Sequence, residues 1–284
     1  MDARIFSHLF LLAILVNPTT VHAEQDPKIL IMAHRGGKGL WPENTLYGYQ
    51  KALESGVDVL EIDIWRTKDG VVIVNHDETV DRTTNGRGEI GTFTLAELQQ
   101  LDSGYRWSVD GTYPYRGAGH TISTLDQVLS QFPDTRFNID IKENSDELIG
   151  ALCDHIDKHS AHDRVMVASF HQRALLKFRK RCPNVATSAG TWEIIRFIIL
   201  SKLGLTRLYD PPFGAFQVPQ RAGVFSITNR TFIEAAQKRG IDVHPWTIND
   251  KTDMKRLINL GVDGIITDYP DRLSEVLAEG ALLR

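Results

Sequence analysis

Short apolar runs alternate with amphipathic segments along the chain from residue 28 onwards. The runs have the length of strands and are rich in Val and Ile, without strict alternation of apolar and polar residues. That pattern is typical of strands buried on both faces. They cover residues 29–33, 57–64, 136–141, 164–169, 185–189, 213–218, 241–246 and 263–267. We therefore expect eight strands of a parallel sheet.

Helical patterns lie between these runs, with apolar residues recurring at the spacing of one helix face. They cover residues 45–54, 124–131, 145–159, 172–180, 191–202, 231–239, 251–260 and 271–278. Several begin on a capping residue, among them Asn44, Ser123, Asn229 and Asp250. Eight β-then-α units in about 255 residues match a (β/α)₈ TIM barrel in number and length, so we expect this α/β fold. A doubly wound open sheet is the alternative.

The second strand departs from the plain repeat. Residues 67–70 follow it and contain an Asp-Gly pair, and a second apolar run then ends at His76. Asp-Gly between two apolar runs indicates a hairpin, and a loop of four or two residues would place His76 opposite Glu61 or Asp63, respectively. The glycine-rich residues 77–121 lack the barrel rhythm. We expect them to form a small insertion over the barrel mouth.

The N-terminus carries a different pattern. Residues 9–16 are an apolar run that follows Arg4 and precedes a small-residue cleavage pattern ending at Ala23. The run is too short to span a bilayer, and no cysteine follows it for a lipid anchor. We expect a signal peptide, residues 1–23, with an uncleaved interfacial anchor as the alternative. The mature protein, residues 24–284, would then be one periplasmic or secreted domain.

Composition and net charge limit the kinds of molecule that the protein is expected to bind. Apolar residues make up 42% of the chain and charged residues 24%, and the net charge is −4 without a basic run. Nucleic acid is therefore not an expected partner, because it requires clustered positive charge. A small anionic substrate remains compatible with this balance. The two cysteines, Cys153 and Cys182, would form a disulfide or remain buried free thiols, and we expect free thiols.

Carboxylates gather where barrel strands end. Glu61 and Asp63 are two residues apart on one strand, so their side chains share a face, and Asp140 and Lys142 have the same spacing. Three carboxylates converging inside a barrel would repel one another unless a cation joined them. Ligands that are all oxygen favour Mg²⁺ or Ca²⁺. The alternative is a structural ion network in which Lys142 and Arg35 neutralise the acids.

Two histidines lie at strand ends beside these acids. His34 ends the first strand and His76 ends the expected hairpin. Imidazole titrates near pH 6.5, so this pair could serve as general base and general acid. Arg35 presents a planar fork suited to phosphate oxygens, and its alternative role is a surface ion pair.

These residues belong to motifs that occur in a fixed order along the chain. The motifs are Ala33-His34-Arg35-Gly36-Gly37, Pro42-Glu43-Asn44-Thr45, Glu61-Ile62-Asp63, Lys68-Asp69-Gly70, His76-Asp77, Arg82-Thr83-Thr84-Asn85-Gly86, Asp140-Ile141-Lys142, Trp246-Thr247-Ile248-Asn249-Asp250 and Gly264-Ile265-Ile266-Thr267-Asp268-Tyr269-Pro270. Over about residues 29–279 the chain resembles the glycerophosphodiester phosphodiesterase family. The resemblance implies a TIM barrel with an insertion after strand 2. It also implies hydrolysis of a glycerophosphodiester to glycerol 3-phosphate and an alcohol.

The resemblance also implies roles for single residues. His34 and His76 match the catalytic pair, and Glu61 and Asp63 match metal ligands. The third ligand of the family is usually Glu, whereas this chain has Asp140, which is one methylene shorter. The Asp-x-Lys form resembles the branch that acts as lysophospholipase D on lysophospholipids.

Four further matches concern the substrate pocket. Lys142 matches a lysine near the phosphate, and Arg35 matches the phosphate-binding arginine. Glu43 matches an acid that supports the metal or His34, and its alternative role is to start a helix. Trp246 matches an aromatic residue lining the glycerol pocket, with core packing as its alternative role.

One helical segment is unusually apolar for the outside of a barrel. Residues 194–205 combine an Ile-rich stretch with Leu-Gly-Leu. This favours either transient contact with a membrane surface or acyl chain, or simple packing against neighbouring helices. Three functions therefore remain open: a glycerophosphodiesterase, a lysophospholipase D, and a non-catalytic binder of phospholipid-derived ligands.

Overall fold

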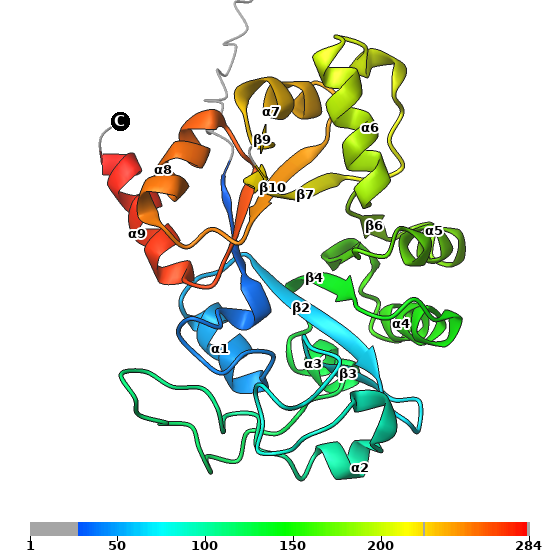
Figure 1. Ribbon diagram of the computed structural model, residues 1–284, viewed down its shortest axis with the longest axis vertical. Coiled ribbons are helices and arrows are strands. Elements are labelled where there is room, and N and C mark those ends of the chain that lie inside the picture. The colour runs from blue at the N-terminus through cyan, green and yellow to red at the C-terminus, as the bar shows by residue number, and fades with distance from the viewer. Residues whose placement is uncertain (1–27, 224, 283–284) are drawn as a thin grey trace, which may run out of the picture.

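The computed structural model of the protein describes residues 28–223 and 225–282, so the expected signal peptide, residues 1–23, lies outside the described residues. All eight expected strands are present, and they form a curled parallel sheet surrounded by helices, which confirms the (β/α)₈ fold (Figure 1). In chain order these strands are β1 (Leu30–Ala33), β2 (Val59–Arg66), β4 (Arg136–Ile141), β5 (Val165–Ala168), β6 (Ala186–Thr187), β7 (Ala215–Pro219), β10 (Asp242–Trp246) and β11 (Gly264–Thr267).

Parallel pairing runs around the barrel. Strands pair in the order β11-β1-β2-β4-β5-β6, and β7 pairs with β10. The two groups meet at a bridge between Ser188 and Ala215 and at the hydrogen bond that Asp263 N donates to Val243 O at 3.1 Å. The C-terminal ends of all eight strands therefore share one edge of the ring.

Helices cover the outside of the strands in Figure 1. They are α1 (Leu46–Glu54), α2 (Leu95–Leu98), α3 (Leu125–Gln131), α4 (Asp146–Lys158), α5 (Gln172–Arg181), α6 (Thr191–Lys202), α7 (Arg230–Gln237), α8 (Lys251–Leu260) and α9 (Pro270–Leu282). Every expected helix is found, and α2 is an addition. Among the described residues, no helix has both the length and the apolar character needed to cross a membrane.

Two of the four expected helix caps are confirmed. At the starts of these four helices, the residues whose side chains accept a backbone N–H are Thr45, Thr124, Asn229 and Asp250. The expectations at Asn44 and Ser123 are wrong by one residue, since the following threonine is the cap in each case. Asn44 instead adopts a positive φ of 53° and its side chain donates to Asp63, so its role is at the site and not in the helix.

The hairpin after β2 is confirmed, but both expected registers are wrong. Strand β3 (Val72–Val74) pairs antiparallel with β2, with Val74 opposite Ile64. Residues 68–70 form the loop, because Thr67 N donates to Val71 O at 2.9 Å, and the last loop residue is a glycine with φ of 85°. Loops of three residues commonly end in such a left-handed glycine. The pairing stops before the histidine that follows β3.

Residues 77–121 form the expected insertion between β3 and α3. They carry the short helices η2 (Ile90–Thr92) and α2. Three of them, Val80, Ile90 and Leu98, form a small core with the flanking Ile73 and Ile122, and each of the five is at most 2% exposed. Trp107 Nε1 donates to Lys38 O at 3.0 Å, which ties the insertion to the loop after β1. It therefore lies beside the C-terminal ends of the strands, where the site is.

The alternation of side chains along β2 and β4 creates the inner wall. The residues that face the surrounding helices are Leu60, Ile62, Ile64, Phe137, Ile139 and Ile141. Between them, Glu61, Asp63, Asn138 and Asp140 point to the inner face, and all four are at least nine-tenths buried. Hydrophobic packing on the outer face thus fixes the position of the acids on the inner face.

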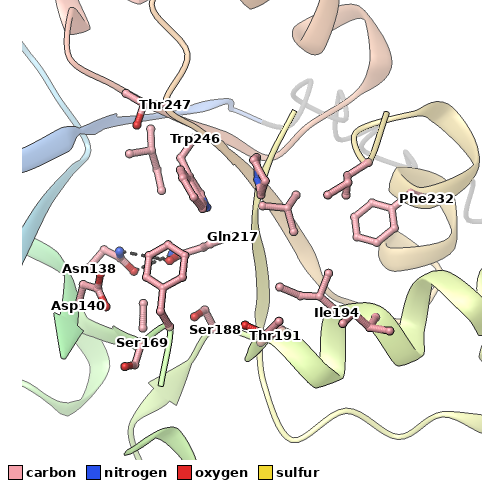
Figure 2. Close-up of a pocket in the computed structure, with 18 of the residues that line it drawn as sticks. Asn138, Asp140, Ser169, Ser188, Thr191, Ile194, Gln217, Phe232, Trp246 and Thr247 are labelled. Carbon is pink, nitrogen blue, oxygen red and sulfur yellow. Dashed lines mark hydrogen bonds between the residues drawn. The ribbon is translucent and has the colours of Figure 1, made fainter. Parts of the chain in front are cut away.

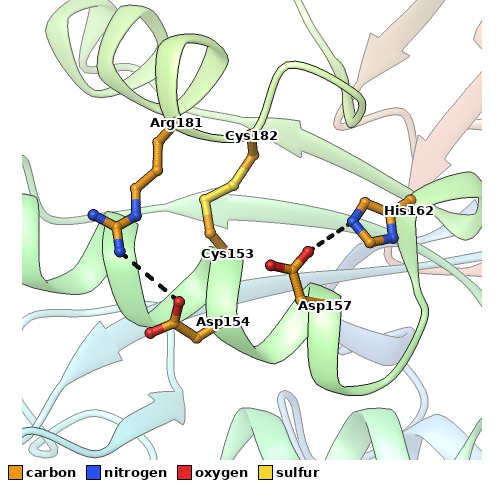
Figure 3. The surroundings of a disulfide bond; sticks show 6 residues. All are labelled: Cys153, Asp154, Asp157, His162, Arg181 and Cys182. Carbon is orange, nitrogen blue, oxygen red and sulfur yellow. Dashed lines mark hydrogen bonds and ion pairs between the residues drawn. A yellow bond between two sulfur atoms is a disulfide. The ribbon is translucent and has the colours of Figure 1, made fainter.

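The expectation of free thiols is wrong. Cys153 on α4 and Cys182 just after α5 form a disulfide with a Cα–Cα distance of 6.1 Å (Figure 3). The two residues are separated by 29 positions, so the bond joins two neighbouring helices of the outer layer. Spacing along the chain gave no measure of this proximity in space.

Replacing both cysteines, Cys153→Ala with Cys182→Ala, should destabilise the fold. A bond that closes a loop of this length contributes about 3 kcal/mol, which corresponds to a fall in Tm of roughly 6–12 °C in a protein of this size. Thermal unfolding followed by circular dichroism measures the shift. Reduction with dithiothreitol should lower the Tm of the natural protein and leave the variant unchanged, and equal Tm values for both proteins would contradict the expectation.

Candidate active site

A cavity of about 970 Å³ opens at the C-terminal ends of the strands. Eight of the nine predicted site residues line it: His34, Arg35, Glu61, Asp63, His76, Asp140, Lys142 and Trp246. Figure 2 shows that Asp140 and Asn138 lie at one end of the pocket, while Ile194 and Phe232 lie at the other. The ninth residue, Glu43, lies behind Arg35. The cavity thus has a charged end and an apolar end.

The three acids form a cluster with two cations. Lys142 Nζ lies 2.8 Å from Asp63 Oδ1 and 2.6 Å from Asp140 Oδ2. Arg35 contacts the other side of the cluster: its backbone N–H donates to Glu61 Oε2 at 2.8 Å, and its Nε lies 3.6 Å from Asp63 Oδ2. The ion network that was the alternative to a metal is therefore present in the structure.

This network leaves negative charge uncompensated. Burial and the nearby charge of Asp63 raise the pKa of Glu61 well above its ordinary value. Burial also raises the pKa of Asp140, against the lowering effect of Lys142. Asp140 Oδ1 is buried without a hydrogen-bond partner among the described residues. A divalent cation prefers oxygen ligands of this kind and would satisfy that atom, so the residues present fit such a cation.

His34 is held by a carboxylate from the far end of the sequence. Its Nδ1 lies 2.6 Å from Asp268 Oδ1, directly after β11. Asn249 fixes that acid in turn: its Nδ2 donates to Asp268 Oδ2 at 2.8 Å, and its Oδ1 accepts from Asp268 N at 2.9 Å. Burial lowers the pKa of His34, although the hydrogen bond to Asp268 opposes the shift. The imidazole is therefore mostly neutral at pH 7, with Nε2 left for the cavity.

His76 has a matching arrangement with its own neighbour. Its Nδ1 lies 2.6 Å from Asp77 Oδ1, and Arg82 Nε donates to Asp77 Oδ2 at 2.6 Å. Burial lowers the pKa of His76 as well, while the charge of Asp63 opposes the shift. Both histidines therefore present Nε2 from a ring whose other nitrogen contacts an aspartate.

Glu43 links Arg35, beside the carboxylate cluster, to Arg82, beside the partner of His76. It accepts from Arg82 at 2.6 and 2.7 Å and from Arg35 at 3.0 Å. Burial alone would raise its pKa, but the two arginines outweigh burial and lower the pKa to about 2. Glu43 therefore remains an anion that orients Arg35 and, through Arg82, Asp77. Its predicted role as a support is consistent with these contacts, which run through arginine and not to His34 directly.

Four further residues of the ordered motifs take part in the site without an expected role: Asp268, Asn249, Asp77 and Arg82. Asp77 is adjacent to its histidine, so the pairing could have been proposed from the sequence. Asp268 and His34 are separated by 234 positions, and their meeting follows only from the pairing of β1 with β11.

Two aromatic rings stand at the charged end of the cavity. Phe170 and Trp246 pack edge to face with ring centroids 5.5 Å apart. Phe170 is 64% exposed, and Lys142 Nζ lies 5.9 Å from its ring centroid. Trp246 thus lines the cavity, and it also packs against the small buried cluster of Met32, Val59 and Ile266.

The two His–Asp contacts predict a sign for a titration experiment. A neighbouring carboxylate favours the charged imidazole, so Asp268→Asn should lower the pKa of His34 further and Asp77→Asn should lower that of His76. Side-chain NMR titration of labelled histidine measures both values. Each variant should shift its own histidine, and Asp271→Asn on the outer helix α9 should shift neither. A rise in either pKa would show that the carboxylate does not act on that ring as described.

Comparison with known proteins agrees with this geometry. The sequence model of the Glycerophosphoryl diester phosphodiesterase family matches residues 34–272. A glycerophosphodiester phosphodiesterase of Caldanaerobacter subterraneus is 34% identical over 262 residues, covering 89% of this chain and 99% of that protein. A human lysophospholipase D is 26% identical and covers 92% of this chain and 90% of that protein.

A solved structure gives the same result. A phosphodiesterase of Oleispira antarctica, in complex with the product sn-glycerol-3-phosphate, superposes with a TM-score of 0.70 at 27% identity. The alignment covers 87% of this chain and 96% of that one. The extent of these matches, together with the order of the motifs, shows that this chain belongs to the glycerophosphoryl diester phosphodiesterase family, whose members are phosphoric diester hydrolases.

Proposed function

We propose that the protein hydrolyses glycerophosphodiesters to glycerol 3-phosphate and an alcohol. The observation that carries the proposal is the convergence of two His–Asp pairs, a carboxylate cluster and two cations at one end of a single cavity. The bound product in the solved Oleispira antarctica structure supports the choice of substrate class. The complete set of reactive groups argues against a non-catalytic binder.

The charged residues have distinct tasks in an in-line displacement at phosphorus. Arg35 and Lys142 would bind the phosphoryl oxygens and stabilise the charge that develops on them. The neighbouring carboxylates outweigh burial and raise the pKa of Lys142, so its ammonium group stays charged throughout the working range of pH. Trp246 would line the pocket for the glycerol moiety.

The histidines would move the protons. His34, mostly neutral, would take a proton at Nε2 from the nucleophile, which is water or a substrate hydroxyl. His76 would give a proton from Nε2 to the leaving alcohol, starting from its imidazolium form, which the charge of Asp63 and the hydrogen bond to Asp77 favour against burial. Asp268 and Asp77 would fix the ring orientation of each and stabilise the charged form that arises in the reaction.

We further propose that Glu61, Asp63 and Asp140 hold a divalent cation, Mg²⁺ or Ca²⁺. When bound, such an ion polarises a phosphoryl oxygen and stabilises the negative charge of the transition state. The unpartnered Oδ1 of Asp140 and the raised pKa of Glu61 support the proposal. Lys142 and Arg35 would then share the compensation of these acids with the cation.

The catalytic roles predict the behaviour of single variants. His34→Ala and His76→Ala should each reduce kcat on glycerophosphocholine by about 10²–10⁴, because each removes one proton-transfer group. A coupled assay for released glycerol 3-phosphate measures the loss, and His162→Ala, on the outer surface, should retain full activity. Chelation by EDTA should abolish turnover, with recovery on adding Mg²⁺ or Ca²⁺. Full activity of both catalytic-site variants would refute the scheme.

We propose that the protein is exported, with a signal peptide cleaved after Ala23 and a periplasmic or secreted mature chain. The disulfide between Cys153 and Cys182 supports this location, since such bonds persist in oxidising compartments. Mass spectrometry of the exported protein tests the cleavage site, and we expect a chain that begins at Glu24.

A lysophospholipase D activity on lysophospholipids is the second candidate, and the apolar end of the cavity favours it. Helix α6 lines this end with Ile194, Ile195, Ile198 and Ile199. Its opposite face packs in the core through the fully buried Phe197. The helix is therefore both packed against its neighbours and open to the cavity, and an acyl chain would have an apolar wall.

Transient contact with a membrane surface through residues 194–205 fits the same substrate. Trp192, Leu203 and Leu208, within or near this segment, are 64–70% exposed. Exposed Trp and Leu side chains are typical of proteins that dip into the interface of a bilayer. An acyl chain could then pass from the lipid surface to the cavity without crossing water.

This candidate predicts a selective defect. Ile199→Glu would place a charge on the apolar wall and should lower kcat/KM on lysophosphatidylcholine by about 10- to 100-fold, while turnover of glycerophosphocholine changes little. Leu176→Glu on α5 is the matched control, since both residues are 54% exposed and Leu176 does not line the cavity. If both substrates lose activity equally, or if lysophosphatidylcholine is not hydrolysed by the natural protein, the second candidate fails.

A further inference from the structure

A group of metal-ligating side chains lies on the outer layer of the barrel, away from the cavity. Asp126 in the first turn of α3 meets His155 and His159 near the C-terminal end of α4. One ligand atom from each residue lies within 4.8 Å of the others. None of the three lines the catalytic cavity, so the mechanism does not account for them.

The contacts are short and the imidazoles are largely shielded from solvent. His159 Nε2 lies 2.8 Å from Asp126 Oδ1, and His155 Nδ1 lies 3.6 Å from the same oxygen. The side chains of His159 and His155 are 13% and 22% exposed. His155 lies in the last turn of α4 and His159 is the C-cap residue four positions later. The end of the helix therefore brings both rings to the carboxylate of Asp126.

The chemistry of the three ligand atoms indicates which kind of ion the site would take. Two imidazole nitrogens with one carboxylate oxygen match Zn²⁺ and related transition metals, and not Mg²⁺ or Ca²⁺, which prefer oxygen ligands alone.

We propose that Asp126, His155 and His159 form a second metal site, specific for Zn²⁺ or a similar transition-metal ion, with water completing the coordination. Lys158 Nζ lies 2.6 Å from Asp126 Oδ1 and provides the counter-charge in the metal-free protein. The lysine is 60% exposed on a flexible stem, so it can move into solvent when the ion enters. The site differs in ligand chemistry and in place from the carboxylate cluster of the cavity.

The position of the site gives the ion a structural role. The disulfide at Cys153 already ties α4 to the end of α5 (Figure 3), and the metal would tie α4 to α3 as well. Helix α4 follows directly on the strand that carries Asp140 and precedes β5. The two links together would fix three consecutive helices of the outer layer.

Titration of the full chain with Zn²⁺ tests the proposal, with saturating Mg²⁺ present to occupy the cavity carboxylates. Isothermal titration calorimetry should detect one binding event that His159→Ala and Asp126→Asn each weaken by more than about 100-fold, since each removes a ligand. Zn²⁺ at about 100 times its Kd should raise the Tm of the natural protein by roughly 5–10 °C and that of these variants by far less. Co²⁺ bound in place of Zn²⁺ should give a visible spectrum typical of low coordination number.

Two variants separate this site from others. His162→Ala removes the neighbouring histidine, which pairs with Asp157 at 2.7 Å outside the triad, and should leave the Zn²⁺ event intact (Figure 3). Asp140→Asn alters the cavity cluster and should also leave it intact. An event that survives His159→Ala, or one that Asp140→Asn abolishes, would overturn the proposal, as would the lack of any Zn²⁺ event in the natural protein.

Discussion

The burial of several like charges inside the barrel is the constraint on which the rest of the site depends. Glu61, Asp63 and Asp140 point inward because hydrophobic packing against the outer helices fixes the residues between them. Such a cluster is costly without counter-charge. Lys142 and Arg35 supply part of this counter-charge. The remaining negative charge and burial together raise the pKa of Glu61.

The counter-charges are themselves held by a second layer of ion pairs. Glu43 contacts both Arg35 and Arg82, and Arg82 also donates to Asp77, the partner of His76. His76, just after β3, is thus linked to the carboxylate cluster through a series of charged contacts. A change at any point would alter the orientation of several groups at once, because each cation serves two anions.

The cavity joins a charged surface and an apolar surface. Its charged end suits a phosphodiester, and its other end has the isoleucines of α6 as an apolar wall. That helix packs through Phe197 on one side and leaves Trp192 exposed. The chemistry of the charged end follows from the family, whereas the proposal of a substrate with an acyl chain rests on this helix.

Hydrophobic periodicity by itself determined the eight strands, the helices of the outer layer, the insertion and the strand-end positions of the site residues. Local pattern is sufficient for these features because each strand must bury its own faces. Trp246 also lies at the cavity, as its motif implied.

Only the tertiary structure decided which distant groups meet. Pairing of the first strand with the last brings Asp268 to His34, and packing of α4 against α5 brings Cys153 to Cys182. A three-residue loop sets the register of the hairpin, and this register differs from both of those that the sequence suggested. These contacts depend on the closure of the barrel, and a linear pattern carries no information on the distance between elements that closure brings together.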